Sequence, residues 1–209
     1  MTSSPLSIAG AFQFDALTFP DERGNFVLWF EQEVFVERVG HRFDISKTHH
    51  AVSTKGTIRG IHLTALPPGQ RKFVYCAYGR VLDVLVDLRE GSPTFGNIAT
   101  VVLDDVKFRS VYIPEGVGHG YAALADDSVV VYLCSTPYAE DREIAIDPLD
   151  PKLSINWPIR SEDMILSARD RDAPDLATVR ESGVLPTYVD CETHRLALSR
   201  GSDADPANL

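Results

Sequence analysis

The strongest constraint on the fold is the close spacing of turn residues. Short runs rich in Val, Ile, Tyr and Phe alternate with turns such as YG at 78–79, GSP at 91–93 and PEG at 114–116. In the run VLDVLVDL, Asp83 and Asp87 lie on the face opposite Leu82, Val84 and Val86, and this period of two indicates a strand. Such runs, separated by turns about every 8–12 residues, predict an antiparallel sandwich or barrel. We expect strands at 73–77, 81–88, 98–103, 110–113 and 128–135.

The charge balance limits the kinds of partner. The 209 residues include 20 Lys and Arg against 30 Asp and Glu, so the formal charge is −10. A nucleic-acid-binding protein normally carries a basic face, so this balance argues against nucleic acid as a partner. The phosphate-binding loops GxGxxG and GxxxxGK[ST] are absent. A local basic pocket for a small phosphorylated molecule remains compatible with the sequence.

The cysteines and the N-terminus bear on the compartment. Cys76, Cys134 and Cys191 form no CxxC pair, so neither a zinc knuckle nor a disulfide framework is expected. The start, MTSSPLSIAGAFQF, lacks the basic residues and the apolar run of a signal peptide. No stretch reaches the ~18 apolar residues of a membrane span. We therefore expect a cytoplasmic protein with reduced thiols and no membrane partner.

Helix signals are sparse. We expect helices at 31–39 and 175–183, the second ended by Gly183, and a capped turn at 161–164. The polar residues 199–209 predict a loose tail. We expect a single domain over 1–209, with a β core at about 5–160 and a C-terminal appendage at about 161–198.

Two of the six histidines have a sequence context that suggests a site. His62 lies in RGIH and His119 in PEGVGHGY, each beside a glycine that lets another group approach closely. A single histidine is more often structural, but two in such contexts within one small β domain favour a shared site. His41 and His194 lack this context, and we expect them at the surface.

Metal ligation is one alternative use of these histidines. The PEGVGH spacing at 114–119 resembles the second motif of the cupin family of β-barrels. Metal-binding cupins supply His-x-His and a following Glu in the first motif, where this chain has HLT at 62–64. A catalytic metal usually has three protein ligands, and the neighbours His49 and His50 would point to opposite faces of a strand. We expect no metal.

A wider resemblance covers roughly residues 5 to 175. The segments DERGNF, RGIHLTALPPGQRKFVYC, SPTFG, VYIPEGVGHGYAAL, VYLCSTPYAEDREIAIDPLD and LSARD are similar, in this order, to motifs of the dTDP-4-dehydrorhamnose 3,5-epimerase family. PPGQRKFVYC most resembles the branch that makes deoxysugars for bacterial antibiotics. The resemblance implies a mainly β fold, a cupin-type jelly-roll barrel with short helices in its N- and C-terminal parts. It also implies a homodimer and a site without metal or cofactor that acts on a dTDP-linked 4-keto-6-deoxy sugar.

The family's reaction removes a proton beside the C4 ketone and returns one on the opposite face, through an enolate. The resemblance assigns His62 as the base, Asp170 as its partner carboxylate, Tyr132 as the proton donor and Lys72 to the enolate oxygen. Imidazole suits the base because it titrates near neutral pH. From the residues alone, the favoured interpretations are a core aromatic for Tyr132, a solvated lysine for Lys72 and an exposed acid for Asp170.

The resemblance also assigns the residues that grip the substrate. Arginines would bind the diphosphate because a guanidinium fork suits phosphate oxygens, and aromatic residues would stack on the thymine. His119 would hold the sugar or a phosphate, with Asp83 orienting its ring. The expected contacts are Arg23 and Arg59 for the diphosphate, Phe26 and Tyr138 for the thymine, and Glu143 in the nucleotide site. Arg169 is also expected to bind substrate, at a position where the family usually has lysine.

Departures from the family motifs affect the binding wall. Leu28 replaces a carboxylate of the N-terminal motif, and Lys47 and His49 stand in a segment that commonly reads QxNxS. These changes leave open which sugar is bound and whether C3, C5 or both centres are inverted. The rival hypotheses are a monoepimerase, a metal-dependent cupin enzyme and a non-catalytic module that binds a sugar nucleotide.

Overall fold

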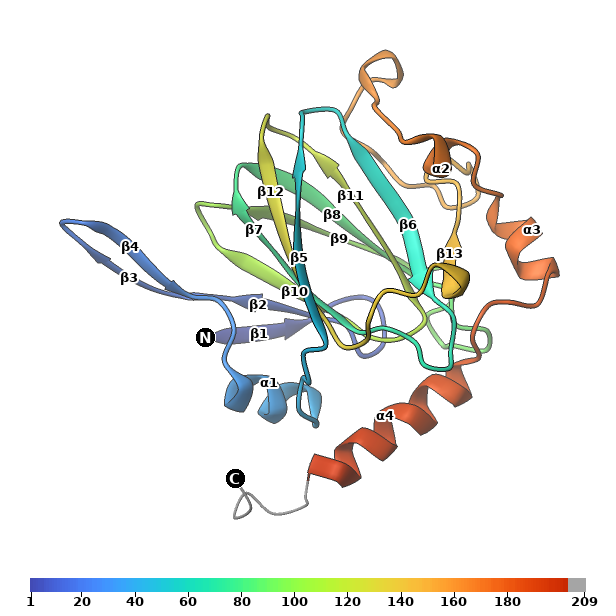
Figure 1. Cartoon of the computed structure of the whole chain (residues 1–209), viewed down its shortest axis with the longest axis horizontal. Helices are drawn as coiled ribbons and strands as arrows, with labels where there is room; N and C mark the ends of the chain where they lie inside the picture. Colours follow the sequence, from blue (N-terminus) through green and yellow to red (C-terminus); the bar gives the residue numbers. More distant parts are fainter. Residues whose placement is uncertain (203–209) are drawn as a thin grey trace.

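Two antiparallel sheets packed face to face form the body of the molecule (Figure 1). The computed structural model describes residues 1–202. The six-stranded sheet has the order β1-β2-β10-β7-β12-β5, and the five-stranded sheet the order β13-β6-β11-β8-β9. The strands of the first sheet are β1 (Thr2–Pro5), β2 (Phe12–Asp15), β10 (Arg109–Ile113), β7 (Lys72–Tyr78), β12 (Ser128–Cys134) and β5 (Lys47–Ser53). Those of the second are β13 (Glu143–Ala145), β6 (Ile58–Thr64), β11 (Val117–Ala123), β8 (Arg80–Asp87) and β9 (Ile98–Asp104).

The five predicted strands are confirmed as β7, β8, β9, β10 and β12, with ends that differ by one residue at most. The predicted period of two in β8 is also correct, since Val81 and Leu85 pack between the sheets while Val84 and Val86 pack on the other side. Both faces of β8 are buried, however, and Asp83 and Asp87 are fully inaccessible to solvent. The C-terminal segment covers the outer face of this sheet, which a period within one strand cannot reveal.

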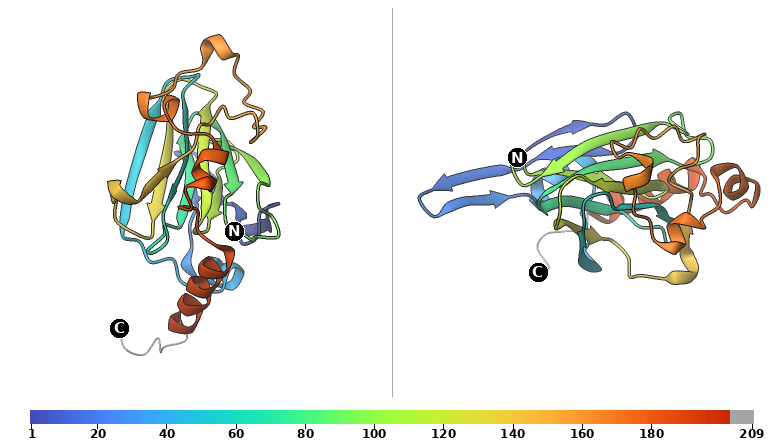
Figure 2. Two further views of the ribbon diagram at one scale, coloured as in Figure 1. Left: turned by 90° about the vertical axis from the view of Figure 1, so that its right-hand side faces the viewer. Right: turned by 90° about the horizontal axis from the view of Figure 1, so that it is seen from above.

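A separate hairpin extends beyond the sheets. It consists of β3 (Leu17–Asp21) and β4 (Gly24–Leu28), which pair only with each other. The views in Figures 1 and 2 agree that it projects away from the body of the molecule. Phe19 and Phe26 lie on it with more than half of their surface exposed, so the hairpin presents aromatic surface to its surroundings.

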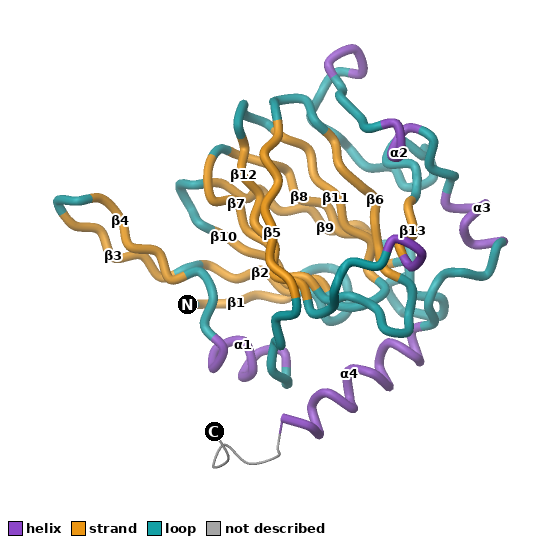
Figure 3. The backbone as a smooth tube through the Cα atoms, viewed as in Figure 1, coloured by secondary structure: helices purple, strands orange, loops and turns teal. Residues whose placement is uncertain are grey.

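The helices lie outside the sheets (Figure 3). Helix α1 (Gln32–Val39) ends at Gly40, whose φ of 87° is left-handed, and the prediction of a helix at 31–39 is confirmed. Helix α3 (Leu176–Glu181) confirms the helix predicted at 175–183, with Asp175 accepting a hydrogen bond from the Thr178 backbone. The remaining elements are η1 (Glu140–Arg142), η2 (Ser161–Asp163), α2 (Ala168–Arg171) and α4 (Tyr188–Ser202).

Two local predictions were wrong in part. The turn at 161–164 is a 3₁₀ turn without a side-chain cap. Helix α4 continues to Ser202, so the predicted loose tail is incorrect for 199–202, and the rest of that prediction lies outside the described residues. Within residues 1–202, no helix is long and apolar enough to cross a membrane.

A buried polar cluster joins α4 to the barrel. His41, predicted at the surface, is fully buried, with its Nδ1 3.3 Å from Arg71. Arg71 contacts Glu115 at 3.0 Å, and Glu115 in turn contacts His194 of α4 at 3.1 Å. His194 is partly exposed, whereas Arg71 and Glu115 are buried. The surface prediction was therefore wrong for His41, because the chain after α1 folds back over the six-stranded sheet.

Candidate active site

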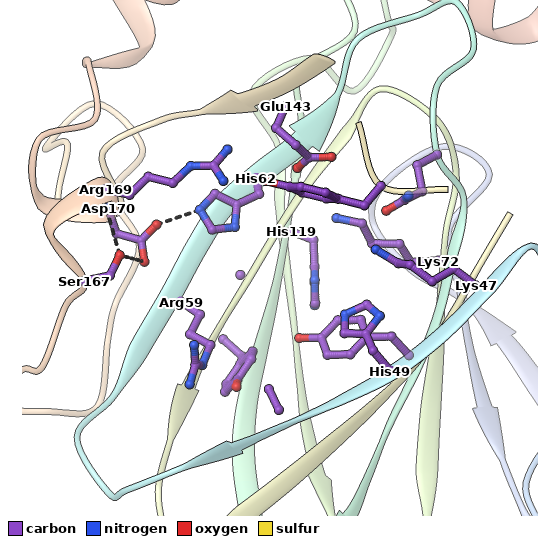
Figure 4. A pocket seen from close by; sticks show the side chains of 16 residues that line it. Lys47, His49, Arg59, His62, Lys72, His119, Glu143, Ser167, Arg169 and Asp170 are labelled. Atoms are coloured by element: carbon purple, nitrogen blue, oxygen red, sulfur yellow. Dashed lines mark hydrogen bonds and ion pairs between the residues drawn. The ribbon is translucent and has the colours of Figure 1, made fainter. Parts of the chain in front are cut away.

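A cavity of about 330 Å³ opens between the two sheets (Figure 4). Strands of both sheets and the segment at α2 supply its walls. Nine of the predicted site residues line it, namely Arg59, His62, Lys72, His119, Tyr132, Tyr138, Glu143, Arg169 and Asp170. The sequence alone could not bring these residues together, because they span more than one hundred positions.

His62 and Asp170 form the closest polar contact in this cavity. His62 Nε2 lies 2.6 Å from Asp170 Oδ1, although the residues are 108 positions apart (Figure 4). The contact exists because Ile165 pairs with the start of β6. The backbone oxygen of Ile165 accepts a hydrogen bond from the backbone N–H of Ile58 at 2.9 Å. This pairing places the following helix, α2, beside His62.

Ser167 fixes the other side of the carboxylate. Its hydroxyl donates to Asp170 Oδ2 at 2.9 Å and accepts from the Asp170 backbone N–H at 3.1 Å, which caps α2. Burial alone would raise the pKa of Asp170, but the hydrogen bonds from His62 and Ser167 outweigh it and lower the pKa below the usual value. The ionised Asp170 can only accept, so His62 Nε2 carries the proton of this hydrogen bond, which leaves Nδ1 as the ring nitrogen that can serve as a base.

His119 faces the same cavity from the neighbouring strand. It pairs directly with His62 in the β11–β6 register, and its Nε2 lies 2.8 Å from Asp83 Oδ1. The strands can approach because Gly60, at φ 113°, has no side chain. A Cβ there would lie 2.6 Å from His119 O. Asp83 is thus a buried partner of His119 rather than a solvated acid.

Tyr132 stands on the opposite wall, on β12 of the six-stranded sheet. It is 8% exposed, and burial raises the pKa of its phenol well above the usual value. The hydroxyl therefore stays protonated at neutral pH and is available as a donor. Its ring meets His119 edge-on, with centroids 5.8 Å apart, and His49 lies parallel to it at 4.6 Å.

Lys72 is buried rather than solvated, at 9% exposure. Burial lowers the pKa of its ammonium group, and the negative charge of Glu143 opposes this shift. A cation in such a dry site interacts strongly with any negative charge that develops nearby. Lys72 therefore suits stabilisation of an oxyanion.

The rim of the cavity is rich in cations. Lys47, Arg59 and Arg169 join Lys72 among the lining residues, against two acids. Lys47 Nζ lies 5.2 Å from the centre of the Tyr138 ring. These positive charges give an acidic protein a local site for an anion, as the charge balance left open.

Two predicted residues lie elsewhere. Arg23 and Phe26 are on the β3–β4 hairpin and do not line the cavity. Arg23 is engaged by Asp21 of the same hairpin, through its side chain and its backbone N–H. Within one chain, the structure does not bring these two residues to the other candidate residues.

Some cavity residues were not predicted as site residues. Ser167 is one, and its S-x-x-D spacing to Asp170 is a recognisable N-cap signal that could have identified it. Gln70 and Tyr121 also line the cavity, as do Lys47 and His49, which the sequence indicated only as departures from the family motifs. Gln70 and Tyr121 carry no comparable local signal.

Known proteins with similar sequences identify the family of this chain. The family model described as dTDP-4-dehydrorhamnose 3,5-epimerase matches residues 5–178. The chain belongs to this family. A dTDP-4-dehydrorhamnose 3,5-epimerase of Mycolicibacterium smegmatis is 48% identical over 96% of this chain and 98% of its own length.

Solved structures of this family have the same fold. The Mycobacterium tuberculosis epimerase superposes with a TM-score of 0.93 at 40% identity, covering 95% of this chain and all of its own. A 3′-monoepimerase from Streptomyces bikiniensis, solved with dTDP-quinovose, gives 0.89 at 43% identity over 94% of this chain and 98% of its own. The expected mainly β, cupin-type jelly-roll fold is confirmed.

Two of the three histidines that line the cavity, His62 and His119, contact carboxylates. Their Nε2 atoms contact Asp170 and Asp83, at 2.6 and 2.8 Å. Over residues 1–202, no group of three histidine, cysteine or acidic side chains is arranged to hold a metal ion.

Proposed function

We propose that this protein is an epimerase of dTDP-linked 4-keto-6-deoxyhexoses, such as dTDP-4-keto-6-deoxyglucose, in deoxysugar biosynthesis. The observation that carries the proposal is the His62–Asp170 contact at 2.6 Å beside the cavity. A carboxylate on one ring nitrogen fixes the tautomer and stabilises the imidazolium that forms when the other nitrogen takes a proton. His62 would act in this way on a carbon next to the ketone.

The position of the acid supports inversion. His62 comes from the five-stranded sheet and Tyr132 from the six-stranded sheet, so the two groups address the cavity from opposite walls. His62 removes the proton, the C–H electron pair forms the enolate, and Tyr132 donates a proton from the other side. Lys72 stabilises the enolate oxygen in between.

Binding of the nucleotide end would use the cationic rim. Arg59 and Arg169 suit the diphosphate, and Tyr138 offers a ring face for the base. Glu143 accepts from the Thr64 hydroxyl at 2.8 Å, which holds its carboxylate at the cavity wall. His119, oriented by Asp83, would hold the sugar or a phosphate.

Arg23 and Phe26 can contribute only if a second copy approaches. The β3–β4 hairpin that carries them projects from the body and exposes Phe26 at 69%. We propose a homodimer in which the hairpin of one copy reaches the cavity of the other. Light scattering tests this, and a monomer at working concentration would contradict it.

The compartment is part of the same proposal. All three cysteines are buried and unpaired, which fits the reducing conditions of the cytoplasm. We propose a cytoplasmic enzyme.

The test is incubation with dTDP-4-keto-6-deoxyglucose in deuterated water, followed by NMR. Deuterium should enter at C3, C5 or both, and His62→Ala should abolish the exchange because the base is lost. No exchange with the unaltered protein would contradict the epimerase proposal, and binding of dTDP without exchange would favour a binding module.

The second candidate is a 3-monoepimerase. It is favoured by a Streptomyces relative named dTDP-4-dehydro-6-deoxyglucose 3-epimerase, 46% identical over 88% of this chain and 93% of its own length. The same NMR experiment distinguishes the two, since a monoepimerase inverts C3 alone.

A further inference from the structure

The cavity contains another histidine that the proposed proton transfer does not use. His49 lies on β5, directly opposite Tyr132 in the antiparallel register with β12. The two rings are parallel within 2°, with centroids 4.6 Å apart. Side chains directly opposite on paired strands are close enough to stabilise each other's position. One face of the Tyr132 ring is therefore covered by an imidazole.

Two ring contacts flank the Tyr132 side chain, which also belongs to the buried core between the sheets. Among residues 1–202, no group forms a hydrogen bond with its hydroxyl. His119 meets the ring edge-on at 71°, and Asp83 in turn holds His119. The phenol is thus held between two imidazoles, and the His49 contact is the one that lies flat against it.

The stack is unsuited to passing a proton. A hydrogen bond to the Tyr132 hydroxyl would need the edge of the imidazole to point at that oxygen. Parallel rings instead place the imidazole over the phenol face. Partial burial, together with the charges of Lys47 and Lys72, lowers the pKa of His49 and keeps its ring neutral at neutral pH. A neutral, flat ring can act by packing.

We propose that His49 is a positioning residue that holds the Tyr132 phenol in the orientation from which it protonates the enolate. The inference rests on the proposed function, in which Tyr132 is the acid. Each enolate has two outcomes: His62 returns a proton and regenerates substrate, or Tyr132 donates and gives the inverted product. A stack that holds Tyr132 in place raises the fraction of the enolate that becomes inverted product.

The experiment compares exchange with inversion in deuterated water. With His49→Ala, His62 still removes the proton, so deuterium should enter recovered substrate at close to the normal rate. Inversion should fall, and the ratio of exchange to inversion should rise about tenfold or more, because small misplacements of a catalytic group cost up to about 10²-fold. Continued exchange also shows that the variant is folded.

Two further variants test the stack itself. His49→Phe keeps a flat ring and should restore the ratio to within about twofold of normal, whereas His49→Val, which is apolar but has no ring, should behave like His49→Ala. Failure of His49→Phe to restore the ratio would overturn the packing role. His50→Ala is the matched control, since His50 is the next residue on β5 and does not line the cavity.

The outcomes separate the two proposals. If the unaltered protein shows no exchange, the epimerase proposal fails. If it exchanges and inverts normally but His49→Ala leaves the ratio unchanged, only the positioning role is overturned.

Discussion

Two histidine–carboxylate pairs join the C-terminal helices to the barrel, and their surroundings differ. His62 of β6 contacts Asp170 of α2 at 2.6 Å, and His194 of α4 contacts Glu115 at 3.1 Å. Asp170 is held by the Ser167 hydroxyl and borders the cavity. Glu115 is already paired with buried Arg71 and does not line the cavity. A histidine–carboxylate pair alone therefore does not make a site. The imidazole must also border a cavity, and the carboxylate must not already be ion-paired with an arginine.

Asp170→Asn should break the first pair with the largest effect. An amide in place of the carboxylate keeps the shape but no longer favours the tautomer of His62 with a proton on Nε2, nor stabilises the imidazolium. We expect kcat for epimerisation to fall by about 10²–10⁴-fold, the usual range for a general base. The rate is measured by NMR, and a loss below about tenfold would contradict the bracing role.

Lys72→Met should separate activity from stability within the same cavity. Loss of the cation should lower kcat by about 10²–10³-fold if it stabilises an oxyanion. Burial lowers the pKa of Lys72 below 10.5, so its charge opposes folding at neutral pH. The melting temperature of the variant should therefore equal or exceed that of the unaltered protein, and this gain should shrink as pH approaches 10.5. A marked fall in melting temperature would argue for a structural lysine.

Glu115→Gln should show the reverse pattern at the second pair. The variant leaves the Arg71 guanidinium buried with only a neutral partner, and breaking a buried ion pair costs about 3–5 kcal/mol. We expect about 3 kcal/mol of lost stability in denaturant unfolding, because glutamine keeps some hydrogen bonding. The kcat of the folded variant should be unchanged. A large fall in kcat would mean that this cluster acts on the cavity.

The comparison also shows what the sequence could predict. Strands with strong apolar alternation, such as β8, were identified within one residue. The strand β5 (KTHHAVS) was not predicted, because its sequence is polar and it lies at the edge of the sheet, where it is held by pairing with β12. α4 was missed because its sequence has no clear apolar stripe, and the buried Cys191 and the His194 contact hold it to the barrel.

Site prediction depended on the family resemblance. Nothing local indicates that Asp170 meets His62, since only the pairing of Ile165 with the start of β6 brings them together. Glu115 lies in the PEGVGH segment that suggested a site, yet it serves the α4 contact. Arg23 lies on a projecting hairpin outside the cavity, and nothing in its local sequence indicates that separation.

His194→Ala gives the smallest expected effect and tests the second pair by pH. The hydrogen bond to Glu115 raises the pKa of His194 above 6.5, so protonated His194 stabilises the fold fully below 6.5 and loses this contribution as pH rises through the raised value. Its side chain is 39% exposed, so screening should keep the contribution below about 1 kcal/mol. The melting temperature difference between the unaltered protein and the variant should be largest near pH 6 and shrink above it. A difference that is constant with pH would show that His194 contributes by packing. Glu115 would then form an ion pair with Arg71 but not with His194.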